Sequence, residues 1–110
     1  MAKIIKTNGE IAEITPKNEK NGFTCEELYA EIGNGCELVE VAFRYDEAVE
    51  GKETSEQRIV IVDEEGVLPD ENGKPRQRFN WKASAKFIEE FHQPILLCGN
   101  VIICSPQEFQ

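Results

Sequence analysis

The chain of 110 residues has the length of one domain, and its 40% hydrophobic and 30% charged residues are typical of soluble globular proteins. This composition excludes an intrinsically disordered chain and a membrane protein. The formal net charge of −9 disfavours direct DNA or RNA binding, because that binding depends on neutralising phosphates with lysine and arginine. We therefore expect a single domain over residues 1–110.

The first residues predict a β-hairpin. Residues 3–6 and 10–15 flank the pair Asn8-Gly9, which suits the positive φ values of tight turns. Pro16 ends the second strand, and the polar residues 17–22 predict a loop.

A helix is predicted from Cys25 to Ile32. Thr24 and Glu27 have the spacing of a capping box, and Gly33 is placed to end the helix. The apolar positions fall at i, i+3, i+4 and i+7 and predict one inward face, made of Cys25, Leu28, Tyr29 and Ile32.

Two strands are predicted in the middle of the chain. Residues 36–45 are rich in β-branched and aromatic side chains and predict a strand with Val39, Val41 and Phe43 on one face. Residues 58–62 are apolar at successive positions, as in a central strand that is covered on both faces. Residues 46–57 contain five acidic side chains and no core pattern, so we expect a flexible acidic excursion that joins two antiparallel strands.

A second helix is predicted after a turn at residues 63–66, a short edge segment at residues 67–69 and a loop at residues 70–79. Asn80 is its expected N-cap, and Pro94 follows its expected end at His92. Apolar periodicity predicts an inward face made of Trp81, Ala85, Ile88 and either Phe91 or His92.

Residues 94–104 form the longest apolar run of the sequence. This run predicts a core strand or a pair of strands, with Gly99-Asn100 as a tight turn or a bulge. The elements together predict an α+β fold, with a mainly antiparallel sheet or partial barrel and two helices in the order ββα-ββ-α-β(β).

Six short blocks occur in an order that resembles a family of small proteins of unknown function found in bacteria, phages and mobile elements. The blocks lie at residues 4–10, 23–28, 37–39, 62–66, 80–84 and 99–104. The resemblance covers nearly the whole chain, although residues 46–57 and 72–79 look longer than the corresponding family segments. It implies a fold and a genetic setting, and it brings no catalytic residues.

No motif in the sequence predicts catalysis, a metal site or a cofactor. The start of the chain has no apolar stretch of signal-peptide length, so we expect a cytoplasmic protein, in a bacterial or bacterial host cell, with free thiols. No cysteine pair has CxxC spacing, and His92 is the only imidazole that could act as a base for Cys98 or Cys104. A histidine at the end of a helix is explained more simply by the helix dipole.

One basic segment stands out from the acidic sequence. Residues 1–73 contain 18 acidic and 7 basic side chains, whereas residues 74–110 contain 3 acidic and 5 basic ones. The residues predicted to bind a partner or ligand are Arg76, Arg78, Trp81 and Lys82, because two arginines beside a helix N-terminus suit an acidic partner or a phosphate. A solvated loop that balances an acidic body is the simpler explanation of this segment and the one that we favour.

The sequence thus predicts a small acidic accessory protein of phage or mobile-element type. We expect a non-enzymatic module that binds another protein through its acidic surface, and counter-defence is one version of that role. It is not expected to bind nucleic acid directly or to associate with a membrane. The alternative is a small-ligand or nucleotide-phosphate-binding module that uses residues 74–86.

Overall fold

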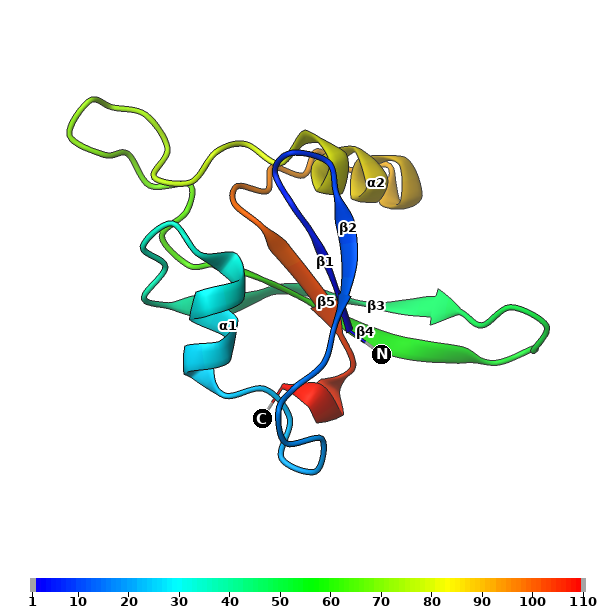
Figure 1. Ribbon diagram of the computed structural model, residues 1–110. Coiled ribbons are helices and arrows are strands. Elements are labelled where there is room, and N and C mark those ends of the chain that lie inside the picture. Colours follow the sequence, from blue (N-terminus) through cyan, green and yellow to red (C-terminus); the bar gives the residue numbers. More distant parts are fainter. Residues whose placement is uncertain (1, 110) are drawn as a thin grey trace.

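The computed structural model describes residues 2–109 and contains a five-stranded antiparallel sheet with one helix on each face (Figure 1). The elements are β1 (Ala2–Ile5), β2 (Ile11–Ile14), α1 (Cys25–Ile32), β3 (Val39–Ala48), β4 (Ser55–Asp63), α2 (Trp81–Phe91), β5 (Val101–Cys104) and the 3-10 turn Pro106–Glu108. The strands lie in the order β2-β1-β5-β4-β3. The predicted α+β fold and element order are confirmed, and the sheet is open, with β2 and β3 at its edges.

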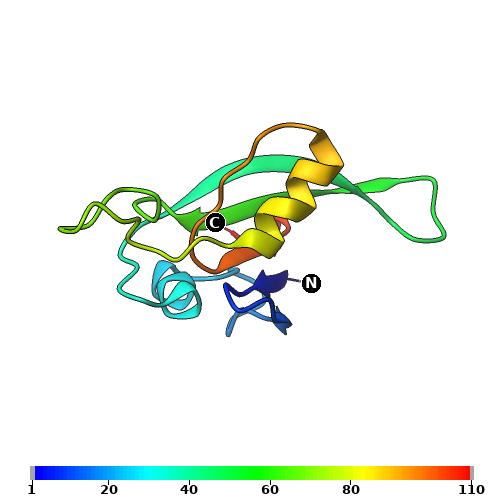
Figure 2. The same ribbon diagram turned by 90° about the horizontal axis from the view of Figure 1, so that it is seen from above.

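The last strand holds the two halves of the sheet together. β5 pairs with β1 on one side and with β4 on the other, so it joins the first hairpin to the β3–β4 hairpin. Its four residues are all buried, because both faces of the sheet are covered. Ile102 and Cys104 pack on the α1 side, whereas Val101 and Ile103 pack on the α2 side. In Figure 2, α2 passes over β3 and β4, whereas α1 lies below these strands in the view.

The N-terminal capping box of α1 forms as predicted. The Thr24 Oγ1 accepts a hydrogen bond from the Glu27 backbone N–H at 3.1 Å, and the Glu27 carboxylate accepts one from the Thr24 N–H at 3.1 Å. Leu28 and Ile32 are buried against the sheet. The inward position predicted for Cys25 is wrong: this side chain is exposed, because α1 contacts the core along Leu28 and Ile32.

A β-bulge in β3 corrects the predicted shared face of Val39, Val41 and Phe43. Val41 lies opposite Ile61 and Phe43 lies opposite Val60, so the intervening residue has no partner of its own. Val39 and Val41 consequently pack on the α1 side, and Phe43 packs on the α2 side. One strand thereby contributes side chains to both cores.

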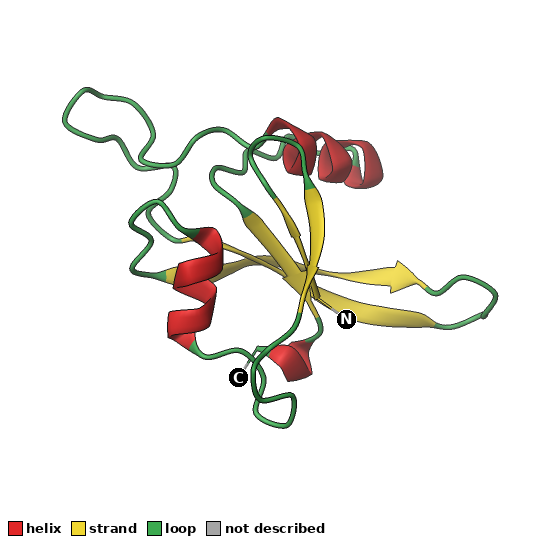
Figure 3. Cartoon of the chain, in the orientation of Figure 1, coloured by secondary structure: helices red, strands yellow, loops and turns green. Residues whose placement is uncertain are grey.

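Half of the predicted acidic excursion, residues 46–48 and 55–57, is regular strand, and the segment joins two antiparallel strands as predicted. β3 continues to Ala48 and β4 begins at Ser55, and these two residues face each other at the end of the hairpin. Backbone pairing stabilises this extension although few of its side chains reach the core. The hairpin projects from the body of the molecule (Figures 1 and 3), and we call residues 46–57 the acidic arm.

The second helix begins after Asn80, as predicted, but it presents a different face to the sheet. Its buried residues are Ala83, Ser84 and Phe87, and its exposed residues include Trp81, at 59%, and Ile88, at 42%. The predicted inward positions of Trp81, Ala85 and Ile88 are therefore wrong, whereas Phe91, one of the two alternatives for the last position, packs against the core. The rotation of α2 is set by hydrogen bonds as well as by hydrophobicity: the Ser84 hydroxyl accepts the Leu97 N–H at 2.9 Å.

The apolar run at residues 94–104 supplies one strand, β5, and not a pair. Its first half is an irregular segment that returns from the end of α2 to its start, where the Leu97 carbonyl accepts the Asn80 N–H at 2.8 Å. Gly99 then adopts a φ of 83° and donates its N–H to the Arg78 carbonyl at 2.7 Å. This bend redirects the chain into β5.

Candidate functional sites: a polar pocket and an acidic arm

The four predicted binding residues lie near the start of α2 but do not form one site. Arg76 faces away toward the turn after β4, where its Nη1 forms an ion pair with the Glu65 Oε2 at 2.9 Å. Its own N–H is bonded to the Leu68 carbonyl at 3.0 Å. These contacts make Arg76 part of the loop's structure.

Trp81 and Lys82 lie against the turn of the first hairpin. The Lys82 Nζ donates to the Gly9 carbonyl at 2.8 Å. A side chain at Gly9 would lie 3.9 Å from the Trp81 ring. The two residues therefore help to hold α2 beside the β1–β2 turn, and the Trp81 indole remains mostly exposed.

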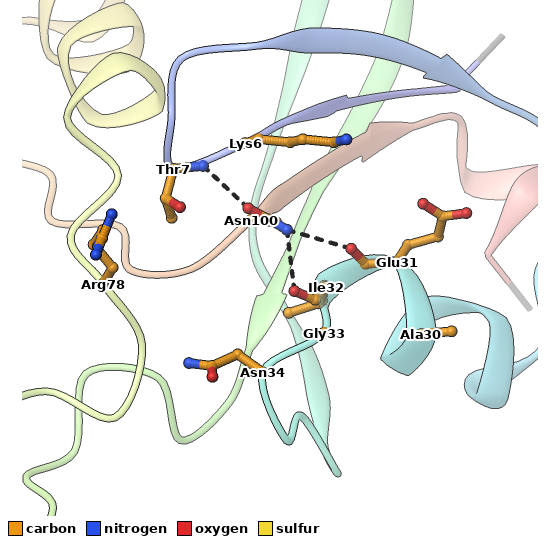
Figure 4. A pocket seen from close by; sticks show the side chains of 9 residues that line it. All are labelled: Lys6, Thr7, Ala30, Glu31, Ile32, Gly33, Asn34, Arg78 and Asn100. Atoms are coloured by element: carbon orange, nitrogen blue, oxygen red, sulfur yellow. Dashed lines mark hydrogen bonds between the residues drawn. The ribbon is translucent and has the colours of Figure 1, made fainter.

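Arg78 is the member of the basic segment that borders a pocket. The pocket is open, has a volume of about 580 Å³, and lies between the β1–β2 turn, the end of α1 and the start of β5 (Figure 4). Its lining residues are Lys6, Thr7, Ala30, Glu31, Ile32, Gly33, Asn34, Arg78 and Asn100. They come from four separate stretches of the chain.

Asn100 organises the centre of this pocket. Its Oδ1 accepts the Thr7 N–H at 3.0 Å, and its Nδ2 donates to the Ile32 carbonyl at 3.1 Å and the Glu31 carbonyl at 3.4 Å. One amide thus connects the first hairpin, β5 and the last turn of α1. It also satisfies two carbonyls at the helix end that would otherwise lack partners.

A buried glutamine supports the side of the pocket that carries Asn34. The Gln77 Oε1 accepts the Asn34 Nδ2–H at 3.2 Å, and the Gln77 Nε2 donates to the Asp63 Oδ2 at 2.8 Å. Gln77 is only 3% exposed and lies directly against Gly99, where a Cβ would come within 3.1 Å of it. The lining near Arg78 is therefore held by a hydrogen-bonded layer.

The charges around the pocket are mixed. The Lys6 Nζ lies 3.7 Å from the Glu10 carboxylate, and the Arg78 guanidinium has no hydrogen-bond or ion-pair partner among residues 2–109. The Glu31 carboxylate lies on the other side of Asn100 from Arg78 (Figure 4). The pocket therefore offers both hydrogen-bond donors and acceptors along its lining.

The acidic arm is the second candidate surface. It contains five acidic residues and one lysine, a net charge of −4. Arg58, at the base of the arm, bonds to the Glu47 carboxylate at 3.1 Å and the Glu56 carboxylate at 3.2 Å. Glu50 and Glu53, near the tip, have no ion-pair partner in the described part of the chain.

The thiols of the three buried cysteines are poorly placed for nucleophilic chemistry. Burial and the nearby Asp63 carboxylate raise the pKa of the Cys36 thiol to about 11. Burial and the Glu108 carboxylate raise the pKa of Cys104 to about 12, and burial also raises the pKa of Cys98. These thiols stay protonated at neutral pH, and the thiolate is the nucleophilic form.

The single histidine ends α2. His92 adopts a left-handed conformation with a φ of 55° and donates its N–H to the Ile88 carbonyl at 2.8 Å. No hydrogen bond links its ring to a cysteine among residues 2–109. Over the same residues, no group of three or more His, Cys, Asp or Glu side chains is placed to hold a metal ion, and no helix is long and apolar enough to cross a bilayer.

No protein-family model, curated protein or solved structure matches this chain. The family resemblance of the six sequence blocks therefore stays a prediction. Of the residues around the pocket, the sequence pointed only to Arg78. Lys6, Thr7 and Asn100 lie in two of the six family-like blocks, which bring no site residues, and Asn34 was marked only as part of a turn-forming Asn-Gly pair.

Proposed function

We propose that this protein is a non-enzymatic binding module that uses the acidic arm to dock onto a basic surface of another protein. The arm carries the proposal because its two strands pair out to Ala48 and Ser55, beyond the helix-covered core. The paired strands hold Asp46, Glu47 and Glu56 at fixed spacing. Glu50 and Glu53 lie in the tip, which is closed by a hydrogen bond from the Val49 N–H to the Thr54 carbonyl at 3.3 Å, so less conformational entropy is lost on binding than with an open flexible loop.

The partner's expected chemistry follows from the charge of the arm. Five carboxylates on a narrow projection favour a groove lined by lysine and arginine, and association is accelerated by electrostatic steering at low salt. Grooves of that kind occur in nucleic-acid-binding enzymes. A counter-defence role, in which the arm occupies such a groove in a host enzyme, is the version of the proposal that we favour.

The proposal is tested by neutralising the tip of the arm. The double variant Glu50→Gln/Glu53→Gln removes two carboxylates that have no ion pair in the described structure, so the fold should be unaffected. We expect the wild type to capture a partner protein from bacterial lysate at low salt, and we expect this variant not to capture it. The wild type should also lose the partner at high salt, because salt screens the attraction between the charges.

The matched control is Glu19→Gln/Glu37→Gln, which removes the same charge from exposed positions outside the arm. It should retain the captured partner. Equal loss of binding with both double variants would indicate a general effect of net charge and would contradict docking by the arm.

A further inference from the structure

Arg78 is an exposed cation on the rim of the polar pocket. The rest of the described chain forms no hydrogen bond or ion pair with its guanidinium. Its neighbour Arg76 is neutralised by Glu65, whereas the guanidinium of Arg78 has no partner within residues 2–109. Arginine offers a planar set of donors that matches the oxygens of a phosphate or carboxylate. An unpaired arginine at a pocket indicates a place for an anionic group.

Other donors border the same space. The Thr7 hydroxyl has no hydrogen bond in the described structure, and the Lys6 ammonium has one long ion pair, at 3.7 Å, which leaves donors available. Figure 4 shows Thr7 and Arg78 on the same side of Asn100. A phosphate beside Arg78 would meet a bidentate donor and a hydroxyl, with a second positive charge further along the pocket.

The remaining lining offers acceptors. The two N–H groups of the Asn34 amide point to the Gln77 Oε1 and the Arg76 carbonyl, which leaves its Oδ1 free to accept, and the Glu31 carboxylate lies beyond Asn100. Acceptors suit hydroxyl or amino groups and would repel a second anion. The pocket volume of about 580 Å³ lies within the range of roughly 300–1,000 Å³ that is common for small-molecule sites.

We propose that this pocket binds a phosphate monoester of a sugar or nucleoside, with the phosphate held by Arg78 and Thr7 and the hydroxyl-bearing part held by Asn34 and Glu31. The lining is prepared for a ligand, because Asn100 and Gln77 already fix the segments that carry these groups. This site is separate from the acidic arm and does not depend on its function.

Isothermal titration calorimetry with four compounds tests the proposal: AMP, ribose 5-phosphate, inorganic phosphate and adenosine. We expect saturable binding of at least one of the two esters and weaker binding of adenosine and inorganic phosphate. Tighter binding of AMP than of ribose 5-phosphate would identify a nucleotide site, and equal binding would identify a sugar-phosphate site. Failure of both esters to bind would overturn the proposal, as would adenosine or inorganic phosphate binding as tightly as the esters.

Two neighbouring arginines provide matched variants. Arg78→Gln should weaken ester binding about tenfold or more, the usual effect of losing a charge-assisted hydrogen bond. Arg76→Gln removes the same charge but lies outside the pocket lining, so it should change affinity much less. Equal weakening by both variants would mean that the ester responds only to the local positive charge, and the assigned site would be wrong. Unfolding midpoints should show that Arg78→Gln leaves stability unchanged.

Discussion

The Tyr45 side chain combines good packing with a polar group that lacks a partner. Its ring contacts three phenylalanine rings in the core under α2, at centroid distances of 6.4 Å from Phe43, 5.3 Å from Phe87 and 5.8 Å from Phe91. Its hydroxyl is buried and forms no hydrogen bond with residues 2–109. A buried polar group without a partner costs about 1–3 kcal/mol.

The substitution Tyr45→Phe should therefore raise the free energy of unfolding by about 1 kcal/mol, because it removes the unpaired hydroxyl and keeps the ring. Urea unfolding measures this change. Tyr29→Phe is the control, since Tyr29 is only partly buried and the substitution should have little effect. A loss of stability in Tyr45→Phe would show that the hydroxyl has a partner in solution.

At the level of single residues, local chemistry was predicted well and pairing between distant residues was not. The caps at Thr24 and Asn80 follow from side chains that act within one helical turn, and both are present. Arg76 and Arg78 look equivalent in the sequence. They differ only because Glu65, eleven residues before Arg76, is folded next to one of them.

The way in which α2 is attached to the sheet depends on Asn80. Its Nδ2 donates to the carbonyls of Ile5 and Gly99, each at 2.9 Å, and its Oδ1 accepts the Ala83 N–H at 3.0 Å. The side chain is fully buried. The Asn80 amide thus caps α2 and also bonds to one carbonyl at the end of β1 and to another just before β5.

Asn80→Ala should destabilise the protein by about 2–4 kcal/mol, because it removes an N-cap and two buried hydrogen bonds to the carbonyls of Ile5 and Gly99. Thr24→Ala, in the exposed cap of α1, should cost about 1 kcal/mol. Both values are obtained from urea unfolding. Equal costs for the two variants would indicate that water replaces the Asn80 amide, and would contradict its role in attaching α2.

The buried face of α2 was mispredicted because burial was judged from hydrophobicity alone. Trp81 and Ile88 are more hydrophobic than Ser84, yet Ser84 is buried because it bonds to the Leu97 backbone. The bulge between Val41 and Phe43 places side chains of β3 in the hydrophobic clusters on both faces of the sheet, and no residue type in the sequence predicts its position. The arm was taken for a loop because its pairing is a property of the backbone.

The whole molecule brings together residues that the sequence keeps apart. Thr7 and Asn100 are 93 positions apart and are joined by one hydrogen bond in the pocket. β5 makes this possible, since it inserts the end of the chain between β1 and β4. The fold class was predictable from periodicity and turns, whereas the pocket required the strand order, which local patterns do not determine.

Buried thiol and phenol groups with raised pKa values lie on both faces of the sheet. Cys36 and Cys104 belong to the core under α1, and Tyr45 belongs to the core under α2. Burial raises the pKa of each of these groups, to about 11 for Cys36 and about 12 for Cys104. In the unfolded chain a thiol titrates near its ordinary pKa of about 9. Alkaline pH should therefore destabilise the packing under α1 and the packing under α2 over the same pH range.

We expect the stability of the protein to be fully present below about pH 9 and to fall progressively as the pH approaches 11–12, because only the unfolded chain releases its thiol protons in that range. Urea midpoints, measured under reducing conditions at increasing pH, should decline accordingly. Cys104→Ala should lower the midpoint at neutral pH, through lost packing, but make the alkaline decline shallower. Cys25→Ser should leave the decline unchanged, since this thiol is already exposed in the folded protein. A midpoint that stays constant up to about pH 11 would show that the buried thiols reach solvent without unfolding.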